Sequence, residues 1–298
     1  MIIHSFTRVA MALVLSASCM HAVVAAGIPA QTVDTALRAR LPKEIQTSGV
    51  MTAVNSGTFP PYAIINDAQS LDGAAADLAE ALGQLLGIKI HHETVSGLSG
   101  ALSGIRGGRY QIDMGPIGDF PERQTSNDFV DYVQEFVAFA VSSGNPLRIN
   151  SLDDTCGKRI AVMSAGSAEK VIKQQSVRCT QVGKPEVQVQ SYTDQPSSLL
   201  AVRSRRADAF FSSQAPLTWL AAKTNGAVTL AGTGAKNGFP DLFQGMVLPK
   251  GSPLTGVMRD ALQKLFDNGT YARIMKKWGL EGNMLKAPGV NLSKQDVK

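Results

Sequence analysis

The chain has 298 residues, 29 of them basic and 24 acidic, with a formal net charge of +5 at neutral pH. So mild a charge, with basic residues that form no stripe with aromatic ones, argues against a nucleic-acid partner. The length allows a large hydrophobic core and lies where a single core tends to divide in two.

The first 26 residues have the composition of a cleavable export signal. Arg8 is the only charged residue before the apolar segment 9–17, and small residues follow in the pattern that signal peptidase accepts. The apolar segment is too short for a membrane anchor, which needs about 20 residues. Cys19 suggests a lipid-modified cysteine, but Ser16 stands where a leucine is expected. We therefore predict cleavage after residues 1–26 and a soluble protein in the periplasm.

Two cysteines, Cys156 and Cys179, follow the predicted signal. An isolated pair in an oxidising compartment favours one disulfide bond. Neither cysteine has a second Cys or a His at metal-ligand spacing, and there is no Cys-x-x-Cys motif. We predict a structural disulfide, no metal site and no cofactor.

Strand-like and helix-like segments alternate along the chain after a lead-in of residues 27–46 with a helical pattern. Short apolar segments predict strands at 50–54, 62–65, 88–93, from 112, and at 159–163, 187–192, 209–211 and 245–248. Apolar residues at helical spacing predict helices at 74–86, 98–106, 168–175, 197–204, 217–223, 254–266 and 271–278. This alternation predicts an α/β fold in two successive units, each with a mainly parallel sheet and helices on both faces. Residues 283–298 are expected to form a loose polar tail.

Several short motifs occur in a specific order between residues 41 and 282. They are Thr58-Phe59-Pro60-Pro61-Tyr62, Asp72-Gly73-Ala74-Ala75-Ala76-Asp77-Leu78-Ala79, Gly118-Asp119-Phe120-Pro121-Glu122-Arg123, Cys156-Gly157-Lys158-Arg159-Ile160-Ala161-Val162, Gly166-Ser167-Ala168-Glu169, Arg206-Ala207-Asp208-Ala209 and 267–279. In this order they resemble the polar amino-acid solute-binding proteins of ATP-driven (ABC) importers, solute-binding protein family 3.

The resemblance implies the two-lobed architecture of periplasmic binding proteins. The first lobe would comprise 47–137 and 241–282, and the second lobe 138–240. The solute would lie in the cleft, over which the lobes close by hinge bending. The implied partner is an inner-membrane ABC permease, served by a monomer.

The resemblance also places a carboxylate-binding group at Arg123. A planar guanidinium meets a carboxylate with two parallel hydrogen bonds. On the other side of the cleft, Gly166, Ser167 and Ala168 would offer N–H groups at a helix start, together with a hydroxyl. The alternatives are a surface arginine at Arg123 and a simple helix cap at Ser167.

Further positions would contact the body of the solute. Phe59 and Leu98 match the positions that sandwich the bound molecule, and Ser56 lies near its variable end. Gly118 belongs to a loop that offers main-chain groups, although Pro116 in that loop has no N–H. Outside the resemblance, Phe59 and Leu98 are equally compatible with core positions.

Ser213 stands where the family usually carries an aspartate for the solute's ammonium group. A serine hydroxyl accepts a hydrogen bond but does not neutralise a charge. Either another acid, such as Asp119 or Asp194, takes this role, or the solute lacks a free α-ammonium. We expect a small carboxylate-bearing solute, an amino acid or a derivative.

Two other functions remain open. Some proteins of this architecture resemble cyclohexadienyl dehydratases, enzymes that need an acid in the cleft, and here Glu169 is the candidate. A diffusible sensor that feeds a membrane receptor is the other. The motifs favour an importer component over both, and we do not expect an enzyme.

Overall fold

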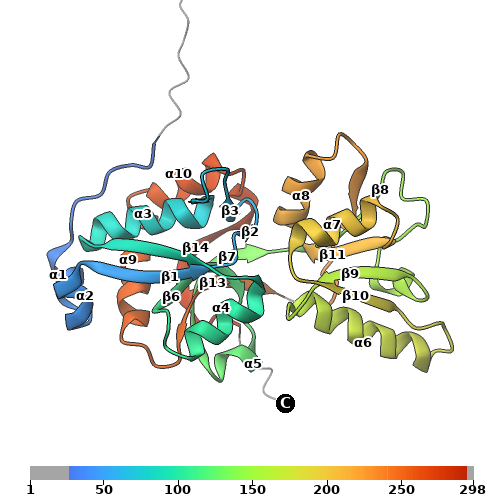
Figure 1. Cartoon of the computed structure of the whole chain (residues 1–298), viewed down its shortest axis with the longest axis horizontal. Coiled ribbons are helices and arrows are strands. Elements are labelled where there is room, and N and C mark those ends of the chain that lie inside the picture. The colour runs from blue at the N-terminus through green and yellow to red at the C-terminus, as the bar shows by residue number, and fades with distance from the viewer. Residues whose placement is uncertain (1–26, 240, 294–298) are drawn as a thin grey trace, which may run out of the picture.

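The computed structural model describes residues 27–239 and 241–293. Two α/β lobes lie side by side and are joined where the chain crosses from one to the other and returns (Figure 1). The two-lobed α/β architecture is therefore confirmed. The predicted signal at 1–26 lies outside the described residues. Among those described, no helix combines the length and apolar character needed to span a membrane.

The first lobe is built on a six-stranded sheet with the order β14-β7-β13-β6-β1-β5. The strands are β1 (Val50–Asn55), β5 (Lys89–Thr94), β6 (Ile112–Gly118), β7 (Asn127–Glu135), β13 (Leu242–Pro249) and β14 (Met284–Val290). The β1 strand is parallel to β5 and β6, whereas β13 and β14 run antiparallel to their neighbours. The sheet is mixed rather than mainly parallel as predicted, because β7 leaves this lobe and β13 and β14 follow the chain's return.

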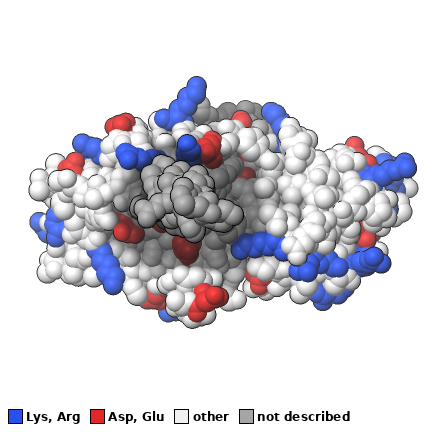
Figure 2. Space-filling model, turned by 90° about the horizontal axis from the view of Figure 1, so that it is seen from above, with Lys and Arg blue, Asp and Glu red and all other residues white. Residues whose placement is uncertain are grey.

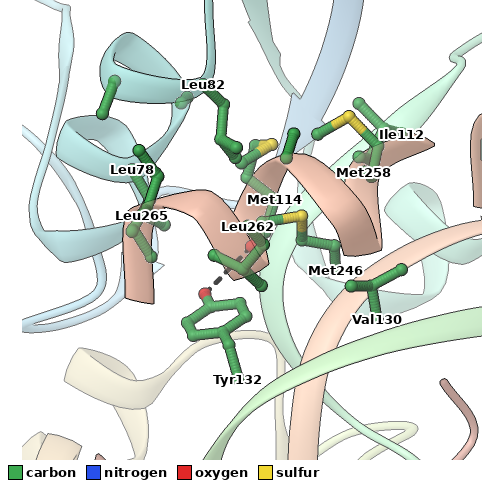
Figure 3. Packing of buried hydrophobic residues seen from close by; sticks show 14 of the residues in the cluster. Leu78, Leu82, Ile112, Met114, Val130, Tyr132, Met246, Met258, Leu262 and Leu265 are labelled. Carbon is green, nitrogen blue, oxygen red and sulfur yellow. Dashed lines mark hydrogen bonds between the residues drawn. The ribbon is translucent and has the colours of Figure 1, made fainter. Parts of the chain in front are cut away.

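Helices cover both faces of this sheet. They are α3 (Ala74–Leu86), α9 (Leu254–Asp267) and α10 (Thr270–Lys277) on one face and α4 (Gly97–Arg106) on the other. Figure 3 shows how side chains of α3, α9 and the strands fill the space between them, with the Tyr132 hydroxyl donating to the Met114 carbonyl oxygen at 3.0 Å. Asp77 of α3 accepts from Lys277 Nζ at 2.8 Å and Trp278 Nε1 at 2.7 Å. Two sequence motifs thus join the helices of the first lobe.

The lead-in forms two short helices where one was expected. They are α1 (Thr35–Ala39) and α2 (Lys43–Ser48). Pro42 precedes α2, and a proline disfavours helical geometry in the residue before it. A small sheet of β2 (Thr58–Phe59), β3 (Ala63–Ile65) and β4 (Leu71–Asp72) follows β1.

The second lobe has a five-stranded sheet with the order β10-β9-β11-β8-β12. Its strands are β8 (Val137–Ser142), β9 (Arg159–Met163), β10 (Gln188–Tyr192), β11 (Ala209–Ser213) and β12 (Val228–Ala231), and its helices are η1 (Leu152–Thr155), α6 (Ser167–Gln181), α7 (Gln195–Arg203) and α8 (Gln214–Ala222). The α6 helix packs on one face, and α7 and α8 on the other. The disulfide between Cys156 and Cys179 joins the turn before β9 to α6, so this prediction is confirmed.

The predicted loose tail was wrong for residues 284–293. After η2 (Glu281–Asn283), β14 pairs with β7 at the edge of the first sheet. Asn291 Oδ1 then accepts from Phe129 N at 2.8 Å, and Asp131 Oδ2 accepts from Leu292 N at 2.9 Å. This segment is ordered because an open strand edge and a buried carboxylate offer it backbone partners. Residues 294–298 lie outside the described part.

Glu135 lies where the chain first crosses between the lobes. Its side chain accepts from Phe136 N at 2.9 Å and, in the second lobe, from Ala215 N at 3.3 Å. It also accepts from Tyr62 Oη at 3.2 Å and Asn283 Nδ2 at 3.0 Å in the first lobe. One buried glutamate thus connects both lobes at the hinge.

Candidate functional site

A cavity lies between the two lobes, and its walls come from both of them. The volume open to the centres of water molecules is about 80 Å³, which fits a small molecule. The cavity is lined by Asn55, Ser56, Phe59, Ala63, Leu98, Ala101, Asp113, Gly115, Pro116, Ile117, Gly118, Arg123, Val137, Met163, Gly166, Ser167, Ala168, Gln195, Ser212, Ser213, Phe239, Leu242 and Gln244. This lining contains one acidic and one basic residue.

The structure brings all nine residues predicted to bind the solute into this lining. They come from seven places in the chain and are Ser56, Phe59, Leu98, Gly118, Arg123, Gly166, Ser167, Ala168 and Ser213. Sequence reasoning missed the polar residues Asn55, Asp113, Gln195, Ser212 and Gln244. Each of these except Gln195 lies within a strand, where sequence alone does not tell which face meets a cleft.

Arg123 reaches the cavity from the short helix α5 (Pro121–Gln124). Its Nη1 donates to the Gly118 carbonyl at 2.8 Å, and its Nη2 donates to the Ala165 carbonyl of the second lobe at 3.1 Å. The guanidinium also lies 5.2 Å from the ring centre of Phe120. No ion pair to Arg123 occurs among the described residues. A guanidinium has more N–H groups than two carbonyl oxygens accept, so Arg123 keeps donors for an anion.

Burial affects the charge of Arg123. Loss of water lowers its pKa to about 10, while the nearby carboxylates of Glu122 and Asp119 act in the opposite direction. The group is therefore still a cation at neutral pH. A partly desolvated cation without an ion-pair partner among the described residues favours an anionic occupant.

The α6 helix of the second lobe begins beside Arg123, which donates to the Ala165 carbonyl directly before the helix N-cap. Gly166 is its N-cap, and Ser167 and Ala168 are the first helical residues, so Ser167 is not the cap that the sequence suggested as an alternative. The first N–H groups of a helix have no partner within it, and its dipole favours negative charge. This helix start and Arg123 together form the donor-rich end of the cavity.

Apolar side chains form much of the remaining cavity lining. Phe59 stacks on Tyr62 with ring centres 5.7 Å apart and planes inclined by 20°. Leu98 and Ala101 of α4, Phe239 and Leu242 also line the cavity. These surfaces are suited to the hydrocarbon part of a small molecule.

The acids suggested as substitutes for the missing aspartate at position 213 lie elsewhere. Asp119 Oδ1 accepts from Gln124 Nε2 at 2.7 Å, and Asp194 caps α7 through Ser197 N at 2.7 Å. Neither lines the cavity. Ser213 does, and its Oγ accepts from Gln244 Nε2 at 3.4 Å. The one acidic side chain in the lining is Asp113.

Asp113 is 4% exposed and accepts one hydrogen bond, from Gly115 N at 2.7 Å. Burial raises its pKa to about 7, against the effect of this hydrogen bond. Because the folded-state pKa exceeds the unfolded one, the folded protein loses stability as pH rises from about 4 to about 7. The loss is on the order of 1.4 kcal/mol for each unit of pKa shift.

We therefore expect the Asp113→Asn variant to gain stability relative to the wild type as pH rises from 5 to 7.5. Urea unfolding of both proteins at the two pH values measures this difference. Parallel stability profiles would show that the carboxyl group titrates normally.

Glu169, the candidate acid of an enzyme, lies outside the cavity lining. Burial acts to raise its pKa, but hydrogen bonds from Lys173, Ser191 and the Ala165 backbone outweigh it and lower the pKa. A carboxylate held in its ionised form does not serve as a proton donor. Among the described residues, no three His, Cys, Asp or Glu side chains are grouped to hold a metal ion.

The two lobes also touch at the rim of the cavity. Lys170 Nζ of α6 pairs with Glu122 Oε1 of α5 at 2.6 Å. Both side chains are more than half exposed, so the pair contributes little to stability. On the face shown in Figure 2, the described basic and acidic side chains are interspersed among uncharged ones.

The model of the bacterial extracellular solute-binding proteins, family 3, matches residues 51–281. The chain belongs to this family. The family 3 match covers both lobes and most of the described residues, and it identifies the chain as a solute-binding protein rather than an enzyme.

Two similar proteins are named for the solutes that they bind. The arginine-binding protein ArgT of Corynebacterium glutamicum is 26% identical over 260 residues, covering 86% of this chain and 82% of the relative. The L-cystine-binding protein TcyJ of Escherichia coli is 26% identical over 237 residues, covering 79% and 84%. The amino acid ABC transporter substrate-binding protein AbpA of Streptococcus pneumoniae, bound to L-arginine, shares the fold with a TM-score of 0.71 at 16% identity, covering 80% and 99%.

Proposed function

We propose that this family 3 protein captures a small carboxylate-bearing solute, an amino acid or a close derivative, for ABC-type import. The observation that carries the proposal is Arg123, a cation in the cavity with unused N–H donors and no ion-pair partner among the described residues. Its position beside the start of α6 supports a carboxylate held from both lobes at once.

The other walls support an amino acid. Phe59 and Leu98 offer apolar surface for its carbon chain. Gln244 and Ser213 lie near the carboxylate end, because Gln244 pairs with Gly118 in the sheet and Gly118 accepts from Arg123. Their side-chain oxygens are suited to an amino group. The relatives that bind arginine and cystine support the same class of solute.

The two-lobed architecture supports delivery of the solute to a permease. A solute that contacts Arg123 and α6 stabilises the closed arrangement of the lobes, and a permease can distinguish this from the open form. We propose a periplasmic monomer, exported through residues 1–26, that docks on an inner-membrane ABC permease. Co-purification with the permease rather than with a receptor ectodomain tests this step.

A thermal-shift screen of amino acids, their amide and diamine derivatives and small organic acids tests the solute class. A solute present at a hundredfold excess over its Kd stabilises the fold by about 2.7 kcal/mol. For a chain of this size the melting temperature should rise by roughly 5–10 °C. The proposal fails if sugars or amines without a carboxylate stabilise the protein and no carboxylate does.

A further inference from the structure

The charge of the cavity is divided between its two ends. Arg123 contacts the Gly118 carbonyl at the last residue of β6, whereas Asp113 is the second residue of the same strand. The sheet register places Asp113 beside Val54 of β1. The two residues after Val54, Asn55 and Ser56, line the cavity. The acidic and basic groups are therefore separated along the length of the strand.

Asp113 faces the cavity side of the sheet. Its neighbours Ile112 and Met114 point into the core under α3 and α9. Since side chains alternate along a strand, Asp113 points to the opposite face, where Leu98 and Ala101 of α4 line the cavity. The carboxyl group thus lies between β1, β6 and α4.

One oxygen of this carboxyl group has no donor in the part of the chain that the structure describes. Oδ1 accepts from Gly115 N at 2.7 Å, and among the described residues nothing donates to Oδ2. The nearby polar lining is already paired, since Asn55 donates to the Glu93 carbonyl at 3.3 Å and accepts from Thr94 Oγ1 at 3.2 Å. A buried carboxylate with a single donor is costly, and a donor brought by the solute removes that cost.

The separation of the two groups sets the length of the solute. Asp113 and Gly118 lie opposite Val247 and Gln244 of β13, which are three residues apart, or about 10 Å along a strand. An α-amino group adjoins its own carboxylate and does not cover such a distance. The far end of a long side chain does.

We propose that Asp113 is a specificity-determining residue that binds the cationic end of a basic amino acid whose carboxylate is held by Arg123. The inference rests on the proposed function, since it takes the carboxylate end from there. The raised pKa of Asp113 is consistent with this role, because burial disfavours the charged form until a cation neutralises it.

Isothermal titration with L-arginine and L-citrulline tests the proposal. The two have nearly the same shape, but the ureido group of citrulline is neutral. The wild type should bind L-arginine at least about tenfold more tightly, as expected for a charge-assisted hydrogen bond. In Asp113→Asn, the affinity for L-arginine should fall by at least about tenfold and the affinity for L-citrulline by less than about threefold.

Asp131→Asn is the matched control, because Asp131 is a fully buried carboxyl group of the same sheet that does not line the cavity. It should leave the ratio of the two affinities unchanged. The comparison of the two solutes on the wild type needs no variant, so it still decides if Asp113→Asn does not fold.

Equal binding of both solutes to the wild type overturns the inference, and so does failure of both to bind. If both bind equally and Arg123→Ala abolishes both, the carboxylate assignment stands and the role of Asp113 alone is wrong. If other carboxylates stabilise the protein in the screen and these two do not, the proposed function stands. The inference that the solute has a basic side chain is then wrong.

Discussion

Replacing Arg123 by alanine should reduce the affinity for every carboxylate solute that the protein binds by at least about a thousandfold. Truncating one partner of a buried charge pair typically costs 2–5 kcal/mol or more, and about 4.1 kcal/mol corresponds to a factor of a thousand. The melting temperature without solute should change little, since Arg123 makes two hydrogen bonds to carbonyl oxygens and no ion pair among the described residues. Isothermal titration measures the affinity.

Two further variants separate the carboxylate contact from the contact between the lobes. Arg123→Lys keeps the charge but not the planar fork, so it should retain weak binding. Lys170→Ala removes the ion pair with Glu122 across the rim without altering the cavity lining. It should bind the solute with almost the affinity of the wild type. A loss of affinity in Lys170→Ala as large as in Arg123→Ala would mean that the titration measures contact between the lobes and not carboxylate recognition.

Removing the disulfide should lower the stability by about 3 kcal/mol. Cys156 and Cys179 are 23 residues apart, and closing a loop of that size restricts the unfolded chain by this amount in the chain-entropy model. The corresponding fall in melting temperature is roughly 6 °C or more. Calorimetry of the Cys156→Ala, Cys179→Ala double variant measures it.

The wild type treated with dithiothreitol controls for the atoms that alanine removes at the buried Cys179. Solute affinity should be unchanged, since Cys179 lies twelve residues along α6 from Ser167, about 18 Å for a helix. Equal melting temperatures of the reduced and oxidised protein would show that the bond does not constrain the chain.

Sequence motifs predicted the parts of the site that lie in loops and at helix starts. Arg123 and Ser167 follow strands at points where the chain turns toward the cleft, and their spacing from neighbouring motifs was specific. The disulfide followed from the count of cysteines together with the predicted export signal. These features depend on short segments of the chain, which a sequence displays directly.

Asp113 and Gln244 could not be predicted in this way. Both are polar residues within strands, and whether their side chains line the cavity depends on which face of the sheet meets the other lobe. The edge strand β14 was missed for a similar reason. It becomes ordered because β7 offers an open edge. Each of these features depends on contacts between segments far apart in the sequence.

The most direct test is a crystal structure of the protein with the solute that binds most tightly in the screen. We expect the solute in the cavity between the lobes, with its carboxylate accepting two hydrogen bonds of about 3 Å from Arg123 and facing the first N–H groups of α6. A solute bound elsewhere, or a guanidinium of Arg123 directed into bulk solvent, would contradict the account.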